Sequence, residues 1–262
     1  TDLKNFCRPA ILKSLDHPSL ILEDDSPSYQ QLCNVLIKLK HQNIEEVVET
    51  GKLYDGRPYS LSSLIEGRRL SALISDGKRL ELEQAAVIVE SIYEALSAAH
   101  SKNILHCDVN PENVILGNGD GQDLRLVNFG LAWPVDLHRE HRGRAGSDID
   151  PIHYTSPERF AKLSHRSSSS DVYSLAALTY RLLVGRVPFE ASERNGLLRL
   201  IADGVVRPPS ELRTDVRLET DRIILAGLAF ESQLRPQDIE DFGSRLVLSL
   251  REKRIVPTPF VI

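Results

Sequence analysis

The segment Asp171–Val184 is apolar on almost every side of a helix, which is typical of a helix surrounded by protein. Such a helix needs a large body of other elements packed around it. The chain has 262 residues, of which 41% are hydrophobic, so it can supply that body as one domain or as two packed lobes. We therefore predict that Asp171–Val184 runs through the middle of a large helical lobe.

Apolar residues at helical spacing predict more helices in the second half of the chain. The predicted ranges are Glu81–His100, Leu197–Ala202, Asp221–Phe230 and Asp238–Leu250. Two short strands, Val114–Leu116 and Leu124–Val127, are expected on either side of a glycine-rich turn. Residues 128–158 form a long polar loop, and loops of this length in compact domains are more often functional or mobile than structural.

The beginning of the chain has a different pattern. It predicts one helix, Tyr29–Leu39, and then two strands, Ile44–Thr50 and Arg57–Leu64, joined by a polar turn. The sequence thus predicts an α+β fold. Its expected parts are a small, mainly β lobe at residues 1–66, a large, mainly α lobe at 67–250, and a linker or tail at 251–262.

Composition excludes several classes of function. The net charge of −5 leaves no large basic surface, so we expect no nucleic-acid partner. No apolar run approaches the length of a membrane span. Three cysteines without metal-type spacing are expected to be reduced thiols in the cytoplasm. The chain opens at Thr1 and has no methionine, so we expect a fragment whose parent protein could carry a membrane anchor elsewhere.

An aspartate and an asparagine, Asp108 and Asn113, stand five positions apart just before a predicted strand. In one tight loop, such a pair can provide a carboxylate that deprotonates an incoming hydroxyl and an oxygen that binds a metal on a phosphate. The plainer interpretation is a polar turn between a helix and a strand.

The segment His106-Cys107-Asp108-Val109-Asn110-Pro111-Glu112-Asn113 resembles the H-R-D-L-x-x-x-N loop of protein kinases. Further motifs follow in the order of that family: Asn128-Phe129-Gly130 at D-F-G, Ser156-Pro157-Glu158 at A-P-E, Asp171–Leu175 in the buried helix, Gly185–Phe189 in the turn after it, and Leu234-Arg235-Pro236. Over roughly residues 29–245 the chain is most similar to bacterial serine/threonine protein kinases. The resemblance implies a bilobal kinase-like fold.

The resemblance also shows where the phosphotransfer site departs from the family. Asp108 stands at the catalytic base, and Asn113 and Asn128 stand at the metal ligands, but Asn128 replaces an aspartate and carries no charge. Asn110 replaces the loop lysine that contacts the transferred phosphate. Cys107 replaces the arginine of H-R-D. Binding of Mg²⁺ is therefore expected to be doubtful.

The small lobe is expected to be truncated, because no glycine-rich phosphate loop occurs in the chain. Lys13 is the one candidate for the phosphate-binding lysine, and the alternative is an ordinary exposed lysine. Its usual partner is a glutamate on the first helix. That place falls near Gln31 or Leu32, so we expect no lysine–glutamate ion pair there.

On the adenine side, the resemblance assigns the backbone of Ser63 and Ile65 to the edge of the base and Ile115 to its face, with Ala10 opposite. Ser62 stands at the gatekeeper position, where a small residue opens a pocket behind the adenine. The alternative for Ser62 is a partly exposed strand serine.

Several matching residues are expected to be structural. By the resemblance, His106 and Phe129 pack in the core between the lobes, and Asp171 holds the backbone of the Asp108 loop. Glu158 and Arg235 are expected to form an ion pair.

These residues predict a pseudokinase, a kinase-like signalling module that regulates or scaffolds protein partners and binds ATP weakly at best. The alternatives are an active or weakly active ATP-dependent serine/threonine kinase, and a domain that senses nucleotide without transferring phosphate.

Overall fold

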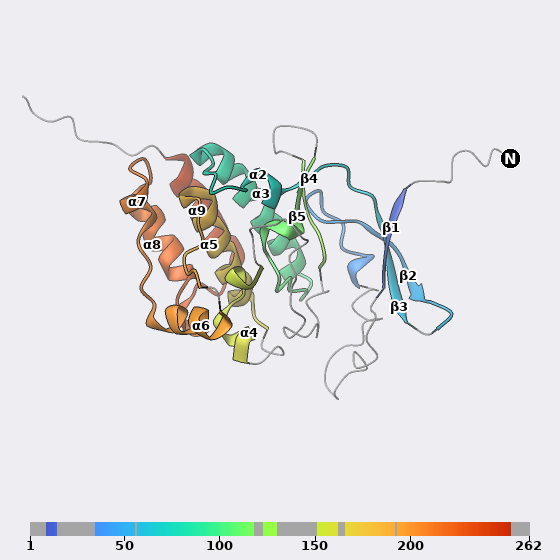
Figure 1. Ribbon diagram of the computed structural model, residues 1–262. Helices are drawn as coiled ribbons and strands as arrows, with labels where there is room; N and C mark the ends of the chain where they lie inside the picture. Colours follow the sequence, from blue (N-terminus) through green and yellow to red (C-terminus); the bar gives the residue numbers. More distant parts are fainter. Residues whose placement is uncertain are drawn as a thin grey trace, which may run out of the picture.

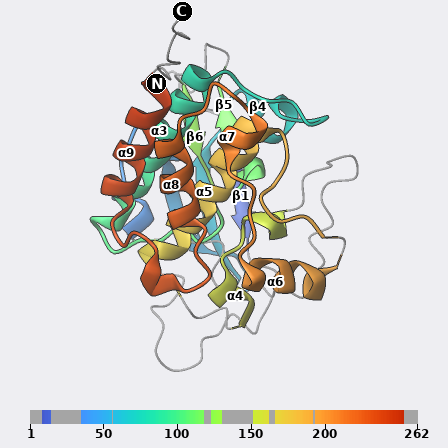
Figure 2. The ribbon, with the colours of Figure 1, turned by 90° about the vertical axis from the view of Figure 1, so that its left-hand side faces the viewer.

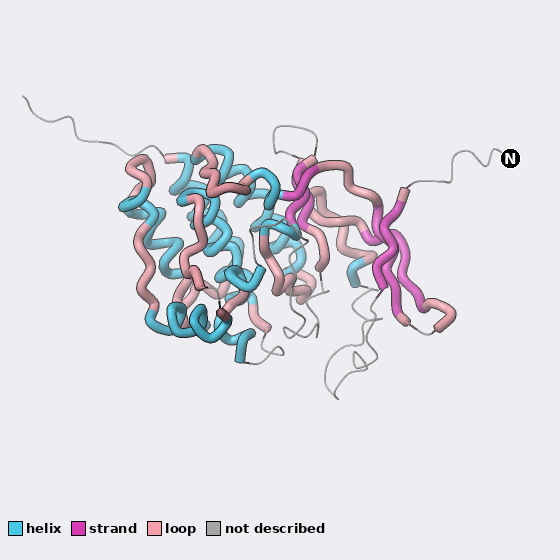
Figure 3. Tube along the Cα trace, viewed as in Figure 1, coloured by secondary structure: helices cyan, strands magenta, loops and turns pink. Residues whose placement is uncertain are grey.

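The computed structural model describes residues 9–14, 35–55, 57–117, 123–129, 151–161, 166–191 and 193–252. Strands gather at one end of the molecule and helices at the other, with a second small sheet between them (Figures 1 and 3). The chain is thus bilobal, with a small β-rich part and a larger helical part, as the α+β prediction required.

The small part is a three-stranded antiparallel sheet in the order β1-β3-β2. Its strands are β1 (Ala10–Ser14), β2 (Val47–Lys52) and β3 (Pro58–Ser63). Both predicted strands of this region are confirmed, although β2 begins three residues later than expected. Of the predicted helix Tyr29–Leu39, only the end is described, and residues 35 and 36 are helical.

The second sheet has the antiparallel order β4-β5-β6 and lies where the two parts meet. Its strands are β4 (Arg68–Arg69), β5 (Val114–Leu116) and β6 (Leu124–Leu126), so the prediction for residues 114–127 is confirmed. The chain crosses from the small sheet to β4 through Gly67. A Cβ atom there would lie 2.1 Å from the carbonyl oxygen of Leu116, so only glycine fits this close approach.

Two long helices organise the large part, α3 (Leu82–His100) and α5 (Ser168–Val184). The remaining helices are α2 (Leu70–Leu73), α4 (Pro157–Ala161), α6 (Arg194–Asp203), α7 (Pro209–Leu212), α8 (Leu218–Gly227) and α9 (Ile239–Arg251). Single 3-10 turns are η3 (Pro111–Asn113), η4 (Pro151–Tyr154) and η5 (Ser232–Leu234). Figure 2 views this helical end directly. None of the described helices combines the length and apolar character that crossing a membrane requires.

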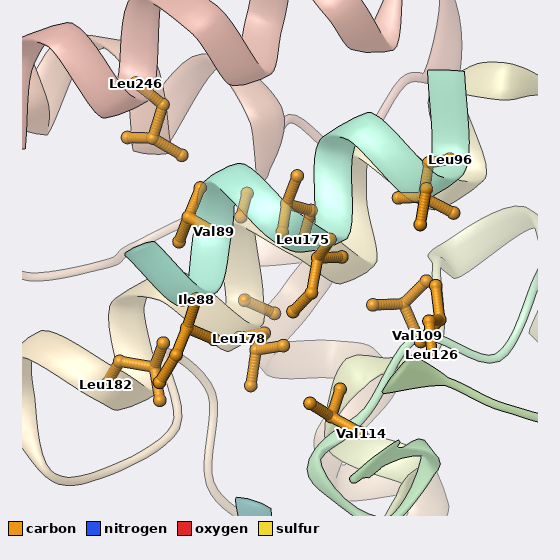
Figure 4. Packing of buried hydrophobic residues seen from close by; sticks show 14 of the residues in the cluster. Ile88, Val89, Leu96, Val109, Val114, Leu126, Leu175, Leu178, Leu182 and Leu246 are labelled. Carbon is orange, nitrogen blue, oxygen red and sulfur yellow. The ribbon is translucent and has the colours of Figure 1, made fainter. Parts of the chain in front are cut away.

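Helix α5 lies at the centre of the large part, as its apolar sequence predicts. Every residue from Ser169 to Val184 is buried. Leucines of α5, among them Leu175 and Leu178, pack against α3 near Ile88 and Val89 (Figure 4). The helix ends at Gly185, whose φ of +85° is the left-handed conformation that glycine adopts without strain.

Helix boundaries differ from the predictions where tertiary contacts decide them. Helix α5 begins three residues before Asp171, and α8 ends at Gly227, three residues before Phe230. The four-residue helices α2 and α7 are too short to show a helical period, so no pattern predicted them. Within the predicted loop 128–158, residues 151–158 contain η4 and the start of α4, and residues 130–150 lie outside the described part.

Candidate functional site

The loop that contains Asp108 is anchored by hydrogen bonds to the carboxylate of Asp171, a fully buried residue of α5. Its Oδ2 accepts from the backbone N–H of His106 at 3.0 Å, and its Oδ1 accepts from the N–H of Cys107 at 2.6 Å. Burial alone would raise the pKa of Asp171, but hydrogen bonds from His100 and from the loop lower it. The predicted structural role of Asp171 is confirmed.

His106 links this loop to Val127, the residue that follows β6. Its Nε2 lies 3.0 Å from the carbonyl oxygen of Val127, and its Nδ1 accepts from the N–H of Asp108 at 3.1 Å. One ring nitrogen therefore donates while the other accepts, which requires the neutral imidazole. Burial lowers the pKa of His106, in agreement with that form. The ring meets Phe129 edge-on at 4.6 Å, so the predicted packing of these two residues is confirmed.

The carboxylate of Asp108 is bound by two asparagine side chains. Nδ2 of Asn110 donates to Oδ1 at 2.8 Å, and Nδ2 of Asn113 donates to Oδ2 at 2.7 Å. With its amide oxygen, Asn110 accepts from the N–H of Glu112 at 2.9 Å and so caps η3. Asn110 therefore serves the local structure of the loop, and it brings no positive charge to the place where the family has lysine.

Asn128 extends this arrangement toward the small sheet. Its Nδ2 donates to Oδ1 of Asn113 at 2.7 Å. Its backbone has a φ of +69°, a left-handed conformation that asparagine tolerates better than most residues. The prediction that the side chains of Asp108, Asn113 and Asn128 lie together is confirmed.

Lys13, on strand β1, contacts the same group of side chains. Its ammonium donates to Oε1 and Oε2 of Glu45 at 2.6 and 2.7 Å, and to Oδ1 of Asn128 at 2.8 Å. The side chain of Lys13 is 21% exposed and that of Glu45 is 6% exposed, so this is a shielded ion pair. Lys13 is therefore not an ordinary exposed lysine. We call Asp108, Asn113, Asn128, Lys13 and Glu45 the polar network.

The ion pair corrects one expectation. Lys13 was expected to lack an acidic partner, and Gln31 and Leu32, the positions considered for it, lie outside the described residues. The partner is Glu45, which follows the first helix and precedes β2. Its backbone N–H donates to the carbonyl oxygen of Leu126 at 3.0 Å. A backbone hydrogen bond to a residue 81 positions further along the chain fixes the place of Glu45. The sequence offered only a weak signal, the two acids Glu45 and Glu46 between the apolar Ile44 and Val47.

A small cavity of about 20 Å³ lies beside the ion pair, between the small sheet and the residues that follow β6. Ser62 lines it and is 1% exposed, and its hydroxyl has no hydrogen-bond partner among the described residues. Apart from the network, the lining is mostly apolar: Leu36, Ile44, Val47, Ser60 and Phe129. The interpretation of Ser62 as a partly exposed strand serine is therefore wrong, and a pocket does lie beside it.

The residues predicted to face an adenine lie in less buried surroundings. Ser63 ends β3, and its N–H already donates to the carbonyl oxygen of Glu46 at 3.1 Å. Ile65 and Ile115 are half-buried, the latter in the middle of β5. The adenine contacts of Ser63, Ile65 and Ile115 stay predictions. Ala10 is exposed at the start of β1.

The donor set of this cleft fits a divalent cation poorly. Mg²⁺ is usually held by carboxylates together with phosphate oxygens. Here Asn113 and Asn128 bring neutral amides, and the amide oxygen of each already accepts a hydrogen bond, from Asn128 and from Lys13. Within the described ranges, no cluster of three or more His, Cys, Asp or Glu side chains could hold a metal.

Cys107 brings no reactive thiolate to the site. Its thiol is buried, and burial raises its pKa to about 12. The carbonyl of Cys107 accepts a hydrogen bond from the buried Arg159 of α4. Pro151 begins the 3-10 turn η4.

Glu158 and Arg235 form the predicted ion pair behind the site. Nη1 and Nη2 of Arg235 donate to the two carboxylate oxygens at 3.0 and 2.8 Å. The Arg235 side chain is fully buried, and that of Glu158 is 16% exposed. Burial would raise the pKa of Glu158, but the hydrogen bonds from Arg235 and Ser170 outweigh it and lower the pKa to about 2. The pair ties α4 to the segment between α8 and α9.

This two-part fold, with an Asp–Asn loop between its parts and a half-buried, ion-paired lysine beside it, is the architecture of a protein kinase domain. The family model described as the protein kinase domain matches residues 9–258, so the chain belongs to the protein kinase family. Serine/threonine-protein kinase Pkn3 of Myxococcus xanthus is 28% identical over 252 residues, which are 93% of this chain and 46% of Pkn3. PkaB of Streptomyces coelicolor is 31% identical over 210 residues, covering 73% of this chain and 49% of PkaB.

A solved structure agrees in fold. The crystal structure of Rad53 1-466 in complex with AMP-PNP matches with a TM-score of 0.65 at 21% identity, over 84% of this chain and 53% of that one. This chain spans less than half the length of Pkn3 and of PkaB. It therefore corresponds to one part of these larger proteins.

Proposed function

We propose that this chain is a pseudokinase, a member of the protein kinase family with impaired phosphotransfer that regulates or scaffolds a partner protein in the cytoplasm. The observation that carries the proposal is the amide-to-amide hydrogen bond from Asn128 to Asn113. These are the two positions from which the family holds its metal ion.

The lack of negative charge on the side chain of Asn128 is the first support. A divalent cation that bridges phosphates is held mainly by anionic oxygens. Asn128 has none, and its amide oxygen is bound to the ammonium of Lys13. Loss of one electrostatic contact to a developing transition state costs about 3 kcal/mol, or about two decades of rate.

The second support is Asn110. A lysine at this place would bring a positive charge toward the transferred phosphate. Asn110 uses its amide nitrogen on Asp108 and its amide oxygen on the N–H of Glu112, so both ends of the amide serve the loop. Asp108, the candidate base, therefore has a neutral amide beside it at the position where the family has a lysine.

A purine site is compatible with these losses. Rad53 was crystallised with the ATP analogue AMP-PNP, and this chain has the same fold. We propose that the cleft binds ATP weakly and almost independently of metal, through Ser63, Ile65 and Ile115 rather than through the phosphates.

A phosphotransfer assay tests the proposal. Labelled ATP is supplied with Mg²⁺ and separately with Mn²⁺, and transfer to a generic protein substrate and to the chain itself is measured. Asp108→Asn is the control for contaminating kinases, because it removes the candidate base of the site. We expect no transfer above that control. Transfer by the wild type that Asp108→Asn abolishes would show a working base and overturn the proposal.

A second candidate, a weakly active serine/threonine kinase, is favoured by one specific observation. The ion pair of Lys13 and Glu45 gives the phosphate lysine a carboxylate partner, which the pseudokinase interpretation did not expect. Asp171 also holds the backbone of His106, and His106 packs against Phe129, as the family's structural residues are expected to do. The same assay separates the two candidates.

A further inference from the structure

Lys13 has no N–H group left for a phosphate. An ammonium group donates three hydrogen bonds. In this structure the acceptors at 2.6, 2.7 and 2.8 Å are the two carboxylate oxygens of Glu45 and the amide oxygen of Asn128. A phosphate can contact Lys13 only by displacing one of these oxygens.

Glu45 is placed firmly enough to resist that displacement. Its side chain is 6% exposed, and its Oε2 also accepts from the backbone N–H of Asn128 at 3.1 Å. Its own N–H donates to the carbonyl oxygen of Leu126 at 3.0 Å. Withdrawing Glu45 from Lys13 would leave a carboxylate buried without its cation, which is strongly unfavourable.

The charges of the polar network also oppose a polyanion. Lys13 carries one positive charge, while Glu45 and Asp108 carry one negative charge each, so the network's formal charge is +1 − 2 = −1. The positive charge of Lys13 is already balanced by Glu45. Because the donor set fits a divalent cation poorly, no metal charge offsets the negative charge of the phosphates. Like charges placed together in a site select against the wrong ligand.

From this geometry we infer that Glu45 is a specificity-determining residue that selects uncharged purine nucleosides over nucleoside triphosphates. The inference rests on the proposed function in one respect, that the cleft takes a purine without help from a metal. It adds the ligand class, an adenosine-type nucleoside, and the residue that sets it.

The glutamine variant isolates this role. Glu45→Gln keeps the size of the side chain, removes its charge, and leaves one acceptor oxygen where there were two. Lys13 then has an N–H available, and the network's charge becomes zero. Glu46→Gln is the matched control, because it makes the same change one residue away, on a side chain that is 54% exposed and pairs with Lys40 outside the network.

The experiment is a calorimetric titration of adenosine, ADP and ATP with a metal chelator present. For the wild type we expect adenosine to bind at least as tightly as ATP. In Glu45→Gln, ATP should bind about tenfold tighter than in the wild type, while adenosine changes less than about threefold. Glu46→Gln should match the wild type. The gain should vanish in the double variant Glu45→Gln with Lys13→Met, because it acts through the lysine.

Two outcomes would overturn the inference. One is a wild type that binds ATP about tenfold or more tighter than adenosine. The other is a Glu45→Gln variant that folds, shown by an unchanged far-ultraviolet spectrum, and yet binds ATP no better. If the variant does not fold, the wild-type ratio alone decides, and absence of both ligands from the wild type counts against the inference.

These results are separable from the test of the proposed function. Phosphate transfer by a chain that still prefers adenosine would remove the pseudokinase proposal and keep the role of Glu45. A chain that transfers nothing but prefers ATP would do the reverse.

Discussion

Asn128 and Asn113 face each other through their amides, with Nδ2 of Asn128 donating to Oδ1 of Asn113 at 2.7 Å. By the resemblance of their motifs, these neutral amides stand at the two positions that correspond to metal ligands in protein kinases. Because each amide is also engaged on its other side, by Lys13 or by Asp108, the cleft is organised around hydrogen bonds among its own residues.

Restoring a single charge should not restore phosphotransfer. We expect Asn128→Asp alone to give no substantial transfer, and Asn128→Asp with Asn110→Lys to fail as well, since parts of one catalytic unit are coupled. The new carboxylate would also stand next to Glu45, which already neutralises Lys13. The measurement is labelled-phosphate transfer with Mg²⁺, with Asp108→Asn in each background as the control. Activity that appears with Asn128→Asp alone contradicts this prediction.

Metal should add little to nucleotide affinity. Since neither amide of the Asn113–Asn128 pair carries charge, we expect the dissociation constant of ATP to change less than about threefold when Mg²⁺ is added. Titrations with Mg²⁺ and with chelator provide the comparison. A gain of about 3 kcal/mol, or more than a hundredfold, would show that the site binds the metal–nucleotide complex well.

Loss of Arg235 should destabilise the large part of the molecule. Arg235→Ala leaves the mostly buried carboxylate of Glu158 without its cation, which costs about 3 kcal/mol for a buried pair. Urea unfolding measures the effect. Arg222→Ala is the matched control, because Arg222 is 76% exposed in its pair with Glu219, and exposed pairs contribute about 0–1 kcal/mol. Equal unfolding midpoints for Arg235→Ala and wild type would refute the pairing.

The cost of Arg235→Ala should shrink in acid. The folded-state pKa of Glu158 is about 2, below its ordinary value of 4.5, so its contribution is present above pH 4.5 and lost as the pH falls toward 2. Without Arg235, burial favours the protonated form of Glu158. As the pH falls, protonation therefore removes the unpaired buried charge from the variant before it weakens the ion pair of the wild type. Stability differences measured by urea at pH 6, 4.5 and 3 should therefore decrease in that order. A difference that stays constant or grows would contradict the pKa shift of Glu158.

Removing the hydroxyl of Ser62 should not destabilise the protein. Its Oγ is buried beside the cavity and has no partner among the described residues, so Ser62→Ala should be neutral or stabilising by about 1 kcal/mol. Ser174→Ala is the contrasting variant, since its hydroxyl donates to the carbonyl oxygen of Tyr154 at 2.8 Å and its loss should cost about 1 kcal/mol. Thermal melting of the two variants gives the comparison. A larger loss for Ser62→Ala than for Ser174→Ala would show that Ser62 has a structural partner.

Much of the fold could be predicted because local patterns were strong. The all-round apolar sequence of α5 indicated a central helix, and His106–Asn113 indicated the loop that Asp171 holds. The ion pair of Glu158 and Arg235 was also foreseen, because both residues belong to recognisable motifs.

Glu45 could not be predicted in the same way. Its role depends on the hydrogen bonds that residues 43–45 make with β6, more than 80 residues further along the chain, and no local period reports such pairing. The direction of the Asn110 side chain was equally hidden, since capping η3 and contacting a phosphate would both suit a polar residue there.

The backbone contacts of Asn43 and Glu45 with Leu126 close the outer edge of the second sheet. The N–H of Leu126 donates to the carbonyl of Asn43 and its carbonyl accepts from Glu45, so β6 is covered on the side that β5 leaves open. An uncovered strand edge invites pairing with a strand of another chain. With its edge closed at Leu126, the sheet β4-β5-β6 cannot be extended there by a strand of another chain.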